Sequence, residues 1–141
     1  MIRRRPHPVA MAETPRVKKS LPKILVIDDD ASVVTALQAR LGGFYRVIGL
    51  EQPERAVEVA QSEQPCLVLC DINMPGMTGD EVALALSMDA RTQFIPVVYL
   101  TSLLPASAAV ELGQQFGNIV GLSKKSSTAQ MLEVIRSAIA R

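Results

Sequence analysis

The sequence predicts an α/β protein with a doubly wound parallel sheet. Two short apolar runs, Ile24–Ile27 and Leu67–Cys70, lead straight into the carboxylates of Asp28 and Asp71. Unbroken runs of this length are typical of strands that are buried on both faces, as they are in parallel sheets. Strand and helix patterns alternate five times along the chain. This alternation favours helices on both faces of the sheet and right-handed crossovers.

The first half of the chain supplies two strand–helix units and begins with a strand over residues 23–30. Apolar residues at helical spacing predict a helix over residues 31–41, with Asp30 as its N-cap and two glycines as its stop. A strand over residues 45–50 and a helix over residues 54–63 follow. A proline closes that helix before the central strand begins.

The second half continues the alternation after the central strand. Apolar spacing predicts a helix over residues 79–88, and a strand over residues 95–101 follows it. A short helix over residues 105–112, ended by a glycine, and a weak strand over residues 119–122 come next. The last helix, over residues 128–140, is strongly amphipathic.

Length and charge divide the chain into one domain and an extension. A chain of 141 residues is long enough for one core. Residues 1–22 contain four prolines and no apolar periodicity, so we predict a flexible basic N-terminal extension before a domain over residues 23–141. The extension carries six basic residues and one acidic residue, whereas the domain carries nine basic and thirteen acidic ones. The acidic balance argues against direct nucleic-acid binding by the domain.

Other features of the sequence exclude further classes of protein. No apolar run approaches the about 20 residues that span a bilayer, so we expect no membrane span and a cytoplasmic protein. The single histidine, His7, lies in the extension, which argues against histidine-based catalysis. Cys66 and Cys70 lie roughly 13 Å apart in an extended strand, too far for a disulfide. We therefore interpret both cysteines as small core residues.

Polar side chains stand at the ends of the predicted strands. Asp28 and Asp29 follow the first strand, Asp71 ends the central one, Thr101 ends the next, and Lys124 follows the last. The carboxyl ends of parallel strands meet at one edge, where ligands bind in open α/β sheets, so these residues share one pocket if their strands are neighbours. Each residue alone has a plainer explanation, such as a turn, a helix cap, a strand-end hydroxyl or a surface lysine. The repeated use of one edge favours a site.

The residue types at this edge indicate phosphoryl transfer. Three crowded carboxylates repel one another, and one of them would take up a proton unless a cation such as Mg²⁺ binds. The ion and the Lys124 ammonium would also offset the charge of a phosphoryl group on Asp71, since aspartate can be a phosphoryl-accepting nucleophile. The Thr101 hydroxyl could donate to a phosphoryl oxygen, and the backbone carbonyl of Asn73 could complete the coordination of the ion.

Four segments together resemble the receiver domain of bacterial two-component response regulators, of the chemotaxis-regulator type. They are Ile24–Asp30, Asp71–Gly79, Val97–Ser102 and Lys124. The resemblance covers about residues 23–141 and implies a flavodoxin-like fold, with a five-stranded parallel sheet of order 2-1-3-4-5 and five helices. It also implies a signalling switch rather than an enzyme acting on other substrates. Such a switch receives a phosphoryl group from a sensor histidine kinase or a histidine phosphotransfer protein, and it catalyses its own phosphorylation and dephosphorylation.

The resemblance also implies a role for each residue of the pocket. Asp71 would be the phosphoacceptor, Thr101 the switch hydroxyl, and Lys124 the residue that contacts the phosphate. The implied Mg²⁺ ligands are Asp28, Asp29, Asp71 and the backbone carbonyl of Asn73. Phosphorylation would change a protein–protein surface that binds a downstream protein target. The sequence leaves open whether the surface of the fourth helix, fifth strand and last helix forms a homodimer.

Two positions depart from the family pattern. The aromatic residue expected three positions before Lys124 is Gly121, and the proline expected after Lys124 is Lys125. A cis peptide would cost about 3 kcal/mol without proline, so we predict a trans, reshaped loop. Taking Lys125 as the family lysine would spoil the alignment of the last helix, which favours Lys124.

Three alternatives stay open at this point. The two departures allow a degenerate receiver that acts only as a docking module. The run Asp28–Ser32 also resembles the signature of haloacid-dehalogenase-type phosphatases, with Asp28 as nucleophile and Asp30 as general acid, although the segment after Asp71 would then be unexplained. We expect a stand-alone receiver, since the chain stops one helix after the fifth strand, but a piece of a hybrid kinase or a longer regulator fits equally well.

Overall fold

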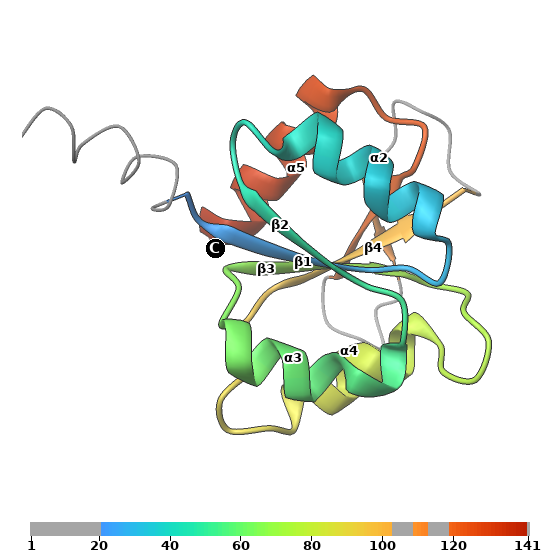
Figure 1. Cartoon of the computed structure of the whole chain (residues 1–141), viewed down its shortest axis with the longest axis vertical. Helices are drawn as coiled ribbons and strands as arrows, with labels where there is room; N and C mark the ends of the chain where they lie inside the picture. Colours follow the sequence, from blue (N-terminus) through green and yellow to red (C-terminus); the bar gives the residue numbers. More distant parts are fainter. Residues whose placement is uncertain (1–20, 103–108, 113–118, 141) are drawn as a thin grey trace, which may run out of the picture.

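A six-stranded sheet runs through the centre of the protein (Figure 1). The computed structural model describes residues 21–102, 109–112 and 119–140. The strands lie in the order β2-β1-β3-β4-β6-β5, and only β5 pairs antiparallel. The strands are β1 Lys23–Ile27, β2 Arg46–Leu50, β3 Leu67–Asp71, β4 Val97–Thr101, β5 Ala109–Leu112 and β6 Ile119–Ser123.

Helices cover both faces of this sheet. Figure 1 shows α2 and α5 on one face and α3 and α4 on the other. The helices of the described residues are α2 Ala31–Leu41, α3 Ala56–Glu63, α4 Gly79–Ser87 and α5 Thr128–Ala140, with a short 3₁₀ helix, η1 Pro53–Arg55, before α3. This arrangement confirms the predicted doubly wound fold. The five parallel strands have the predicted order 2-1-3-4-5, with β6 as the fifth.

The predicted helix over residues 105–112 was wrong where the structure describes it. Ala109–Leu112 is the strand β5, paired with β6, so the described residues hold four α-helices where five were expected. The physical reason is that so short a helix depends on tertiary packing. The same segment as a strand gives its backbone groups partners along β6, which would otherwise be a sheet edge. Residues 105–108 lie outside the described residues.

Local capping explains why α2 and α5 begin where the sequence predicted. The Asp30 carboxylate accepts a hydrogen bond from the backbone N–H of Ser32 at 2.9 Å, which confirms Asp30 as the N-cap of α2. Before α5, the Ser127 hydroxyl accepts from the N–H of Gln130, and the Gln130 side chain accepts from the N–H of Ser127. This reciprocal pair satisfies amide groups that the first turn of a helix leaves without partners.

The register of the sheet brings the strand ends to one edge. Ile27 at the end of β1 pairs with Cys70, so Asp28 and Asp71 leave the sheet at the same level. Asp71 in turn pairs with Leu100, one residue before the end of β4.

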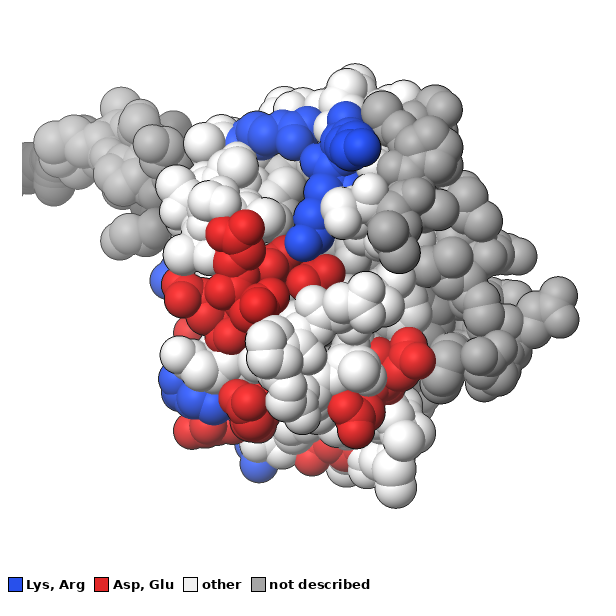
Figure 2. Space-filling view, turned by 90° about the vertical axis from the view of Figure 1, so that its right-hand side faces the viewer, with Lys and Arg blue, Asp and Glu red and all other residues white. Residues whose placement is uncertain are grey.

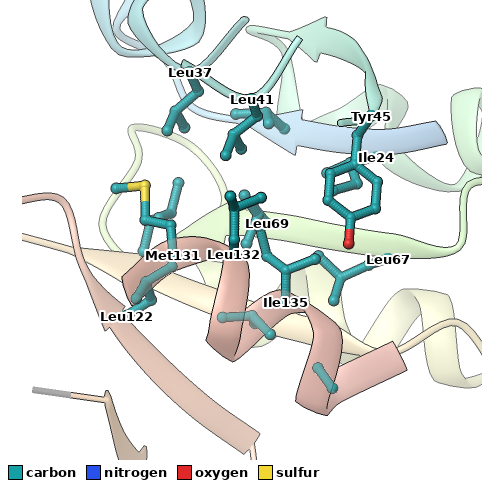
Figure 3. Close-up of a cluster of buried hydrophobic side chains, with 14 of the residues drawn as sticks. Ile24, Leu37, Leu41, Tyr45, Leu67, Leu69, Leu122, Met131, Leu132 and Ile135 are labelled. Atoms are coloured by element: carbon teal, nitrogen blue, oxygen red, sulfur yellow. The ribbon is translucent and has the colours of Figure 1, made fainter. Parts of the chain in front are cut away.

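The core fills both sides of the sheet with aliphatic side chains. Between the sheet and the pair α2 and α5, Leu69 packs in a buried cluster with Leu37 and Leu41 of α2 and with Met131 and Ile135 of α5 (Figure 3). A second cluster lies between the sheet and the pair α3 and α4. Burial of these side chains fixes the sheet between its helices.

Both cysteines are free and lie in or beside β3, as predicted. Cys70 is fully buried, and burial raises the pKa of its thiol far above the ordinary value. Cys66 is half-buried, and burial raises the pKa of its thiol as well.

Two predictions concern regions outside the sheet. No helix among the described residues is long and apolar enough to cross a bilayer. The predicted flexible extension over residues 1–22 falls, except for its last two residues, outside the described residues.

We expect Leu69→Ala to lower the free energy of unfolding by about 2–5 kcal/mol, because Leu69 is fully buried and its truncation leaves a cavity in the core. Urea denaturation measures this change. Leu84→Ala is the matched control, since Leu84 is 57% exposed on α4, and its effect should stay within about 0.5 kcal/mol. Equal effects of the two substitutions would contradict the assigned core.

Candidate functional site

Three carboxylates gather at the carboxyl edge of the sheet. Asp28 and Asp29 follow β1, Asp71 ends β3, and one oxygen of each lies within 4.8 Å of the others. Figure 2 views the molecule from the side toward which β1 and β4 point, and it shows a group of acidic side chains with basic side chains directly beside it. Asp28 and Asp71 are buried, whereas Asp29 is exposed.

Asp28 is fixed by its own turn. Its backbone N–H donates to the carbonyl of Leu50 at 3.1 Å, and its Oδ1 accepts from the N–H of Asp30 at 2.9 Å. Its Oδ2 is buried and faces the Lys124 ammonium, with which it forms an ion pair at 2.8 Å. One Asp28 oxygen is therefore held by the fold, while the other is directed into the site.

Lys124 supplies the positive charge of the site. Its Nζ lies 2.8 Å from Asp28 Oδ2 and 3.4 Å from Asp71 Oδ1. Burial by itself would lower the pKa of this ammonium, but Asp28 and Asp71 outweigh burial and raise the pKa above the ordinary value. Lys124 therefore stays charged between two buried carboxylates.

The ionised form of the Asp71 carboxyl is only partly stabilised by its surroundings. Burial raises its pKa, and the nearby Asp28 carboxylate raises it further, whereas Lys124 and the backbone N–H of Asn73 lower it. The raising effects win, so one ammonium does not fully compensate the two buried acids. A further cation would relieve this cost.

The segment after Asp71 folds tightly back against β3. Gly76 has a φ of +83°, which favours glycine. At Gly79 an added Cβ would lie 2.7 Å from the Asp71 carbonyl oxygen, so only glycine allows this approach. The N–H of Gly79 donates to the carbonyl of Ile72 at 2.8 Å, and Thr78 caps the helix α4 that begins there. The turn thereby places the start of α4 directly beside the acidic group.

The residues of the pocket fit Mg²⁺. A hard divalent cation takes carboxylate oxygens and keeps several waters. The cluster offers such oxygens from Asp28, Asp29 and Asp71, including the buried Asp28 Oδ2 that faces Lys124. A bound dication would also relieve the repulsion that raises the pKa of Asp71.

The structure brings Asp28, Asp29, Asp71 and Lys124 together, as the strand pattern predicted. Thr101 is buried at the end of β4, and its carbonyl accepts from the N–H of Lys124 at 2.9 Å. The part that the Thr101 hydroxyl plays stays a prediction. The coordinating role of the Asn73 carbonyl also stays a prediction, and this residue is exposed.

The structure also locates the two positions that depart from the family pattern. Gly121 on β6 pairs with Tyr99 on β4. Lys125 is exposed, and no described peptide bond is cis, which confirms the trans loop.

Asp30, the general acid of the phosphatase alternative, instead caps α2 and accepts from the N–H and hydroxyl of Ser32.

Comparison with known families identifies the family of this fold. A family model described as the response regulator receiver domain matches residues 24–136. The chain belongs to this family. The match includes all six strands apart from Lys23, and it includes the acidic group, so the family assignment argues against the phosphatase alternative.

Individual receiver proteins show the same relationship. The chain is 31% identical over 119 residues to protein PilH of Pseudomonas aeruginosa, covering 84% of this chain and 98% of PilH. It is 32% identical over 120 residues to the response regulator Rre1 of Synechocystis, covering 84% of this chain and 52% of Rre1. It thus spans about half the length of several curated relatives that it matches. Among solved structures, the chemotaxis protein CheY4 of Vibrio cholerae superposes with a TM-score of 0.73 at 25% identity, covering 84% of this chain and 99% of CheY4.

We expect Asp71→Asn to stabilise the metal-free protein at neutral pH. The raised pKa means that the folded state binds the Asp71 proton more tightly than the unfolded chain does. The free energy of unfolding therefore falls as the pH rises from the ordinary carboxyl pKa through the raised one, and the loss is complete above that value. Thermal unfolding in a chelator, from mildly acidic to neutral pH, should show a Tm advantage of the variant that grows with pH.

Asp89→Asn removes the same charge and is the control for this experiment. At Asp89, desolvation is outweighed by hydrogen bonds from the Gln61 side chain at 2.7 Å and the Arg91 N–H at 3.0 Å, which lower the carboxyl pKa. This variant should therefore lower the Tm at neutral pH. A neutral-pH Tm of Asp71→Asn at or below that of the wild type would contradict the conclusion that the ionised Asp71 carboxylate destabilises the metal-free fold.

Proposed function

We propose that the protein is the phosphoacceptor of a two-component phosphorelay and that Asp71 receives the phosphoryl group. The observation that carries the proposal is that Asp71 lies close to Asp28 and forms an ion pair with Lys124 at the carboxyl edge of a receiver fold. Asp71 is buried, yet it lies in the cluster with the exposed Asp29. A carboxylate in this setting is anchored by the fold and lies next to groups that can stabilise added negative charge.

The proposed donor is a phosphohistidine of a sensor histidine kinase or of a histidine phosphotransfer protein. A carboxylate oxygen of Asp71 bonds to phosphorus while the bond between phosphorus and the imidazole nitrogen breaks. The nitrogen leaves with the bonding electron pair, and the donor imidazole is restored. Lys124 lies 3.4 Å from Asp71 Oδ1, where its ammonium offsets the charge of the incoming phosphoryl oxygens. Thr101 is proposed to donate its hydroxyl to the same group.

Mg²⁺ is the proposed cofactor, held by Asp28, Asp29, Asp71 and the backbone carbonyl of Asn73. When bound, the ion neutralises phosphoryl charge that builds up during the transfer. The chain's own contribution is to keep Asp28 oriented through its turn and to keep Asp71 beside Lys124.

Phosphorylation adds negative charge to a site that is already acidic, and this local change is the proposed signal. We propose that it alters a protein–protein surface that binds a downstream target. The protein is thus a signalling switch that also catalyses its own dephosphorylation, in the cytoplasm, with no direct role for nucleic acid. A homodimer formed on activation is one form that this surface could take.

Phosphorylation with radiolabelled acetyl phosphate tests the proposal. We expect Mg²⁺-dependent labelling of the wild type and none of Asp71→Asn. Lys124→Ala should slow the labelling by about 10²-fold, because it removes a charge placed beside the transferred group. Lys125→Ala is the matched control, since this lysine is exposed and should label at the wild-type rate.

Magnesium binding is measured independently through the rise in Tm that Mg²⁺ produces. Labelling of Asp71→Asn at the wild-type rate would contradict the assigned phosphoacceptor. A wild type that neither gains Tm with Mg²⁺ nor takes up label would instead favour the docking module that the departures at Gly121 and Lys125 allow.

A further inference from the structure

The loop that carries Lys124 is held by hydrogen bonds rather than by a restricted backbone. It runs from Lys124 to Ser127, between β6 and α5, and contains two lysines and two serines with no proline. Without proline, no residue of the loop has a ring-restricted φ. Three bonds tie its first part to the sheet: Lys124 N–H to the Thr101 carbonyl at 2.9 Å, Ser126 N–H to the Ser123 carbonyl at 3.1 Å, and Lys125 N–H to Ser123 Oγ at 3.0 Å.

The far side of the loop is held by a residue from another element. Arg40, in the last turn of α2, donates from Nη2 to the Ser126 carbonyl at 2.6 Å and from Nε to Thr128 Oγ1 at 3.0 Å. The two acceptors flank Ser127, so one guanidinium joins the loop to the first residue of α5. Guanidinium has several donors in a fixed plane and suits this double contact, whereas an ammonium is a single point of attachment. Ser126 is only 2% exposed, so water does not readily replace the contact.

One side of the Lys124 side chain faces a gap in the packing. A cavity of about 80 Å³ separates α2 from the loop and is lined by Arg40, Lys124, Leu37, Leu100 and Met131 among others. Atoms that face a gap lose the dispersion contacts that would otherwise hold them. Besides its ion pairs with Asp28 and Asp71, the position of the ammonium depends on where the loop backbone is anchored. Arg40 adds an anchor that comes from α2 rather than from the sheet.

We propose that Arg40 is a positioning residue for phosphoryl transfer, because it holds the loop after β6 so that the Lys124 ammonium stays between Asp28 and Asp71. This inference rests on the proposed function of Asp71. Arg40 has no contact with the acidic group, so its effect passes through Lys124 alone. The chemistry of the transfer and the carboxylate ligands of the ion are untouched by it.

The test compares labelling by acetyl phosphate at saturating Mg²⁺ in a set of Arg40 variants. Arg40→Gln should lower the maximal labelling rate by about tenfold, because a small misplacement of a catalytic group is costly. Arg40→Lys should restore part of the rate, since its ammonium can reach one of the two acceptors. Arg46→Gln is the matched control, because it removes the same charge from an exposed residue that starts β2 at the opposite edge of the sheet. The Mg²⁺-induced rise in Tm should be the same in all four proteins.

A double-mutant cycle separates positioning from a general effect on the fold. If Arg40 acts through Lys124, then Arg40→Gln has no further effect on the labelling rate in the Lys124→Ala background. Multiplicative losses in the double variant would overturn the inference, as would a wild-type rate in Arg40→Gln. A weakened Mg²⁺ effect on the Tm of Arg40→Gln would overturn it too, because the residue would then act on the acidic group.

The same set of proteins distinguishes this inference from the proposed function. If Asp71→Asn and Lys124→Ala lose labelling while Arg40→Gln does not, only the role of Arg40 fails. If Asp71→Asn labels like the wild type, the proposed function itself fails. Circular dichroism of each variant shows whether it is folded. Thr128→Val is a milder variant, because it removes only the contact between Arg40 Nε and Thr128 Oγ1.

Discussion

The ion pair between Lys124 and the two buried carboxylates is the interaction on which the site depends. Asp28 and Asp71 are both removed from water, and mutual repulsion would make that placement costly without the ammonium between them. One positive charge compensates incompletely, as the raised pKa of Asp71 shows. The remaining imbalance favours the binding of a further cation. The excess of negative charge that the fold maintains in this site is thus the basis of the proposed chemistry.

The parallel sheet brings these charged residues together. Parallel register aligns the ends of β1, β3, β4 and β6, so that residues far apart in the sequence leave the sheet at one level. Two aliphatic layers hold these strands rigidly between their helices. The hydrophobic core therefore positions the polar residues, while the polar residues add little to the core.

Much of the fold and site could be predicted because the signals were local. Apolar runs that end in carboxylates marked β1 and β3, and the N-cap at Asp30 fixed the start of α2. The strand β5 could not be predicted, since a four-residue segment owes its conformation to the neighbouring strand rather than to its own sequence. Arg40 was also missed. It is the only charged residue of α2, but its partners lie 86 and 88 residues away, and no spacing rule reaches that far.

The burial of Cys70 has a practical consequence for following the opening of this sheet. Its thiol lies one residue before Asp71, fully buried and with a strongly raised pKa, whereas Cys66 at the other end of the strand is half-buried. Alkylation requires an accessible thiolate, so Cys70 reacts only in molecules in which the core between the sheet and the helices α3 and α4 has opened. The rate at which this sulfur atom is modified thus reports how often the core beside β3 opens.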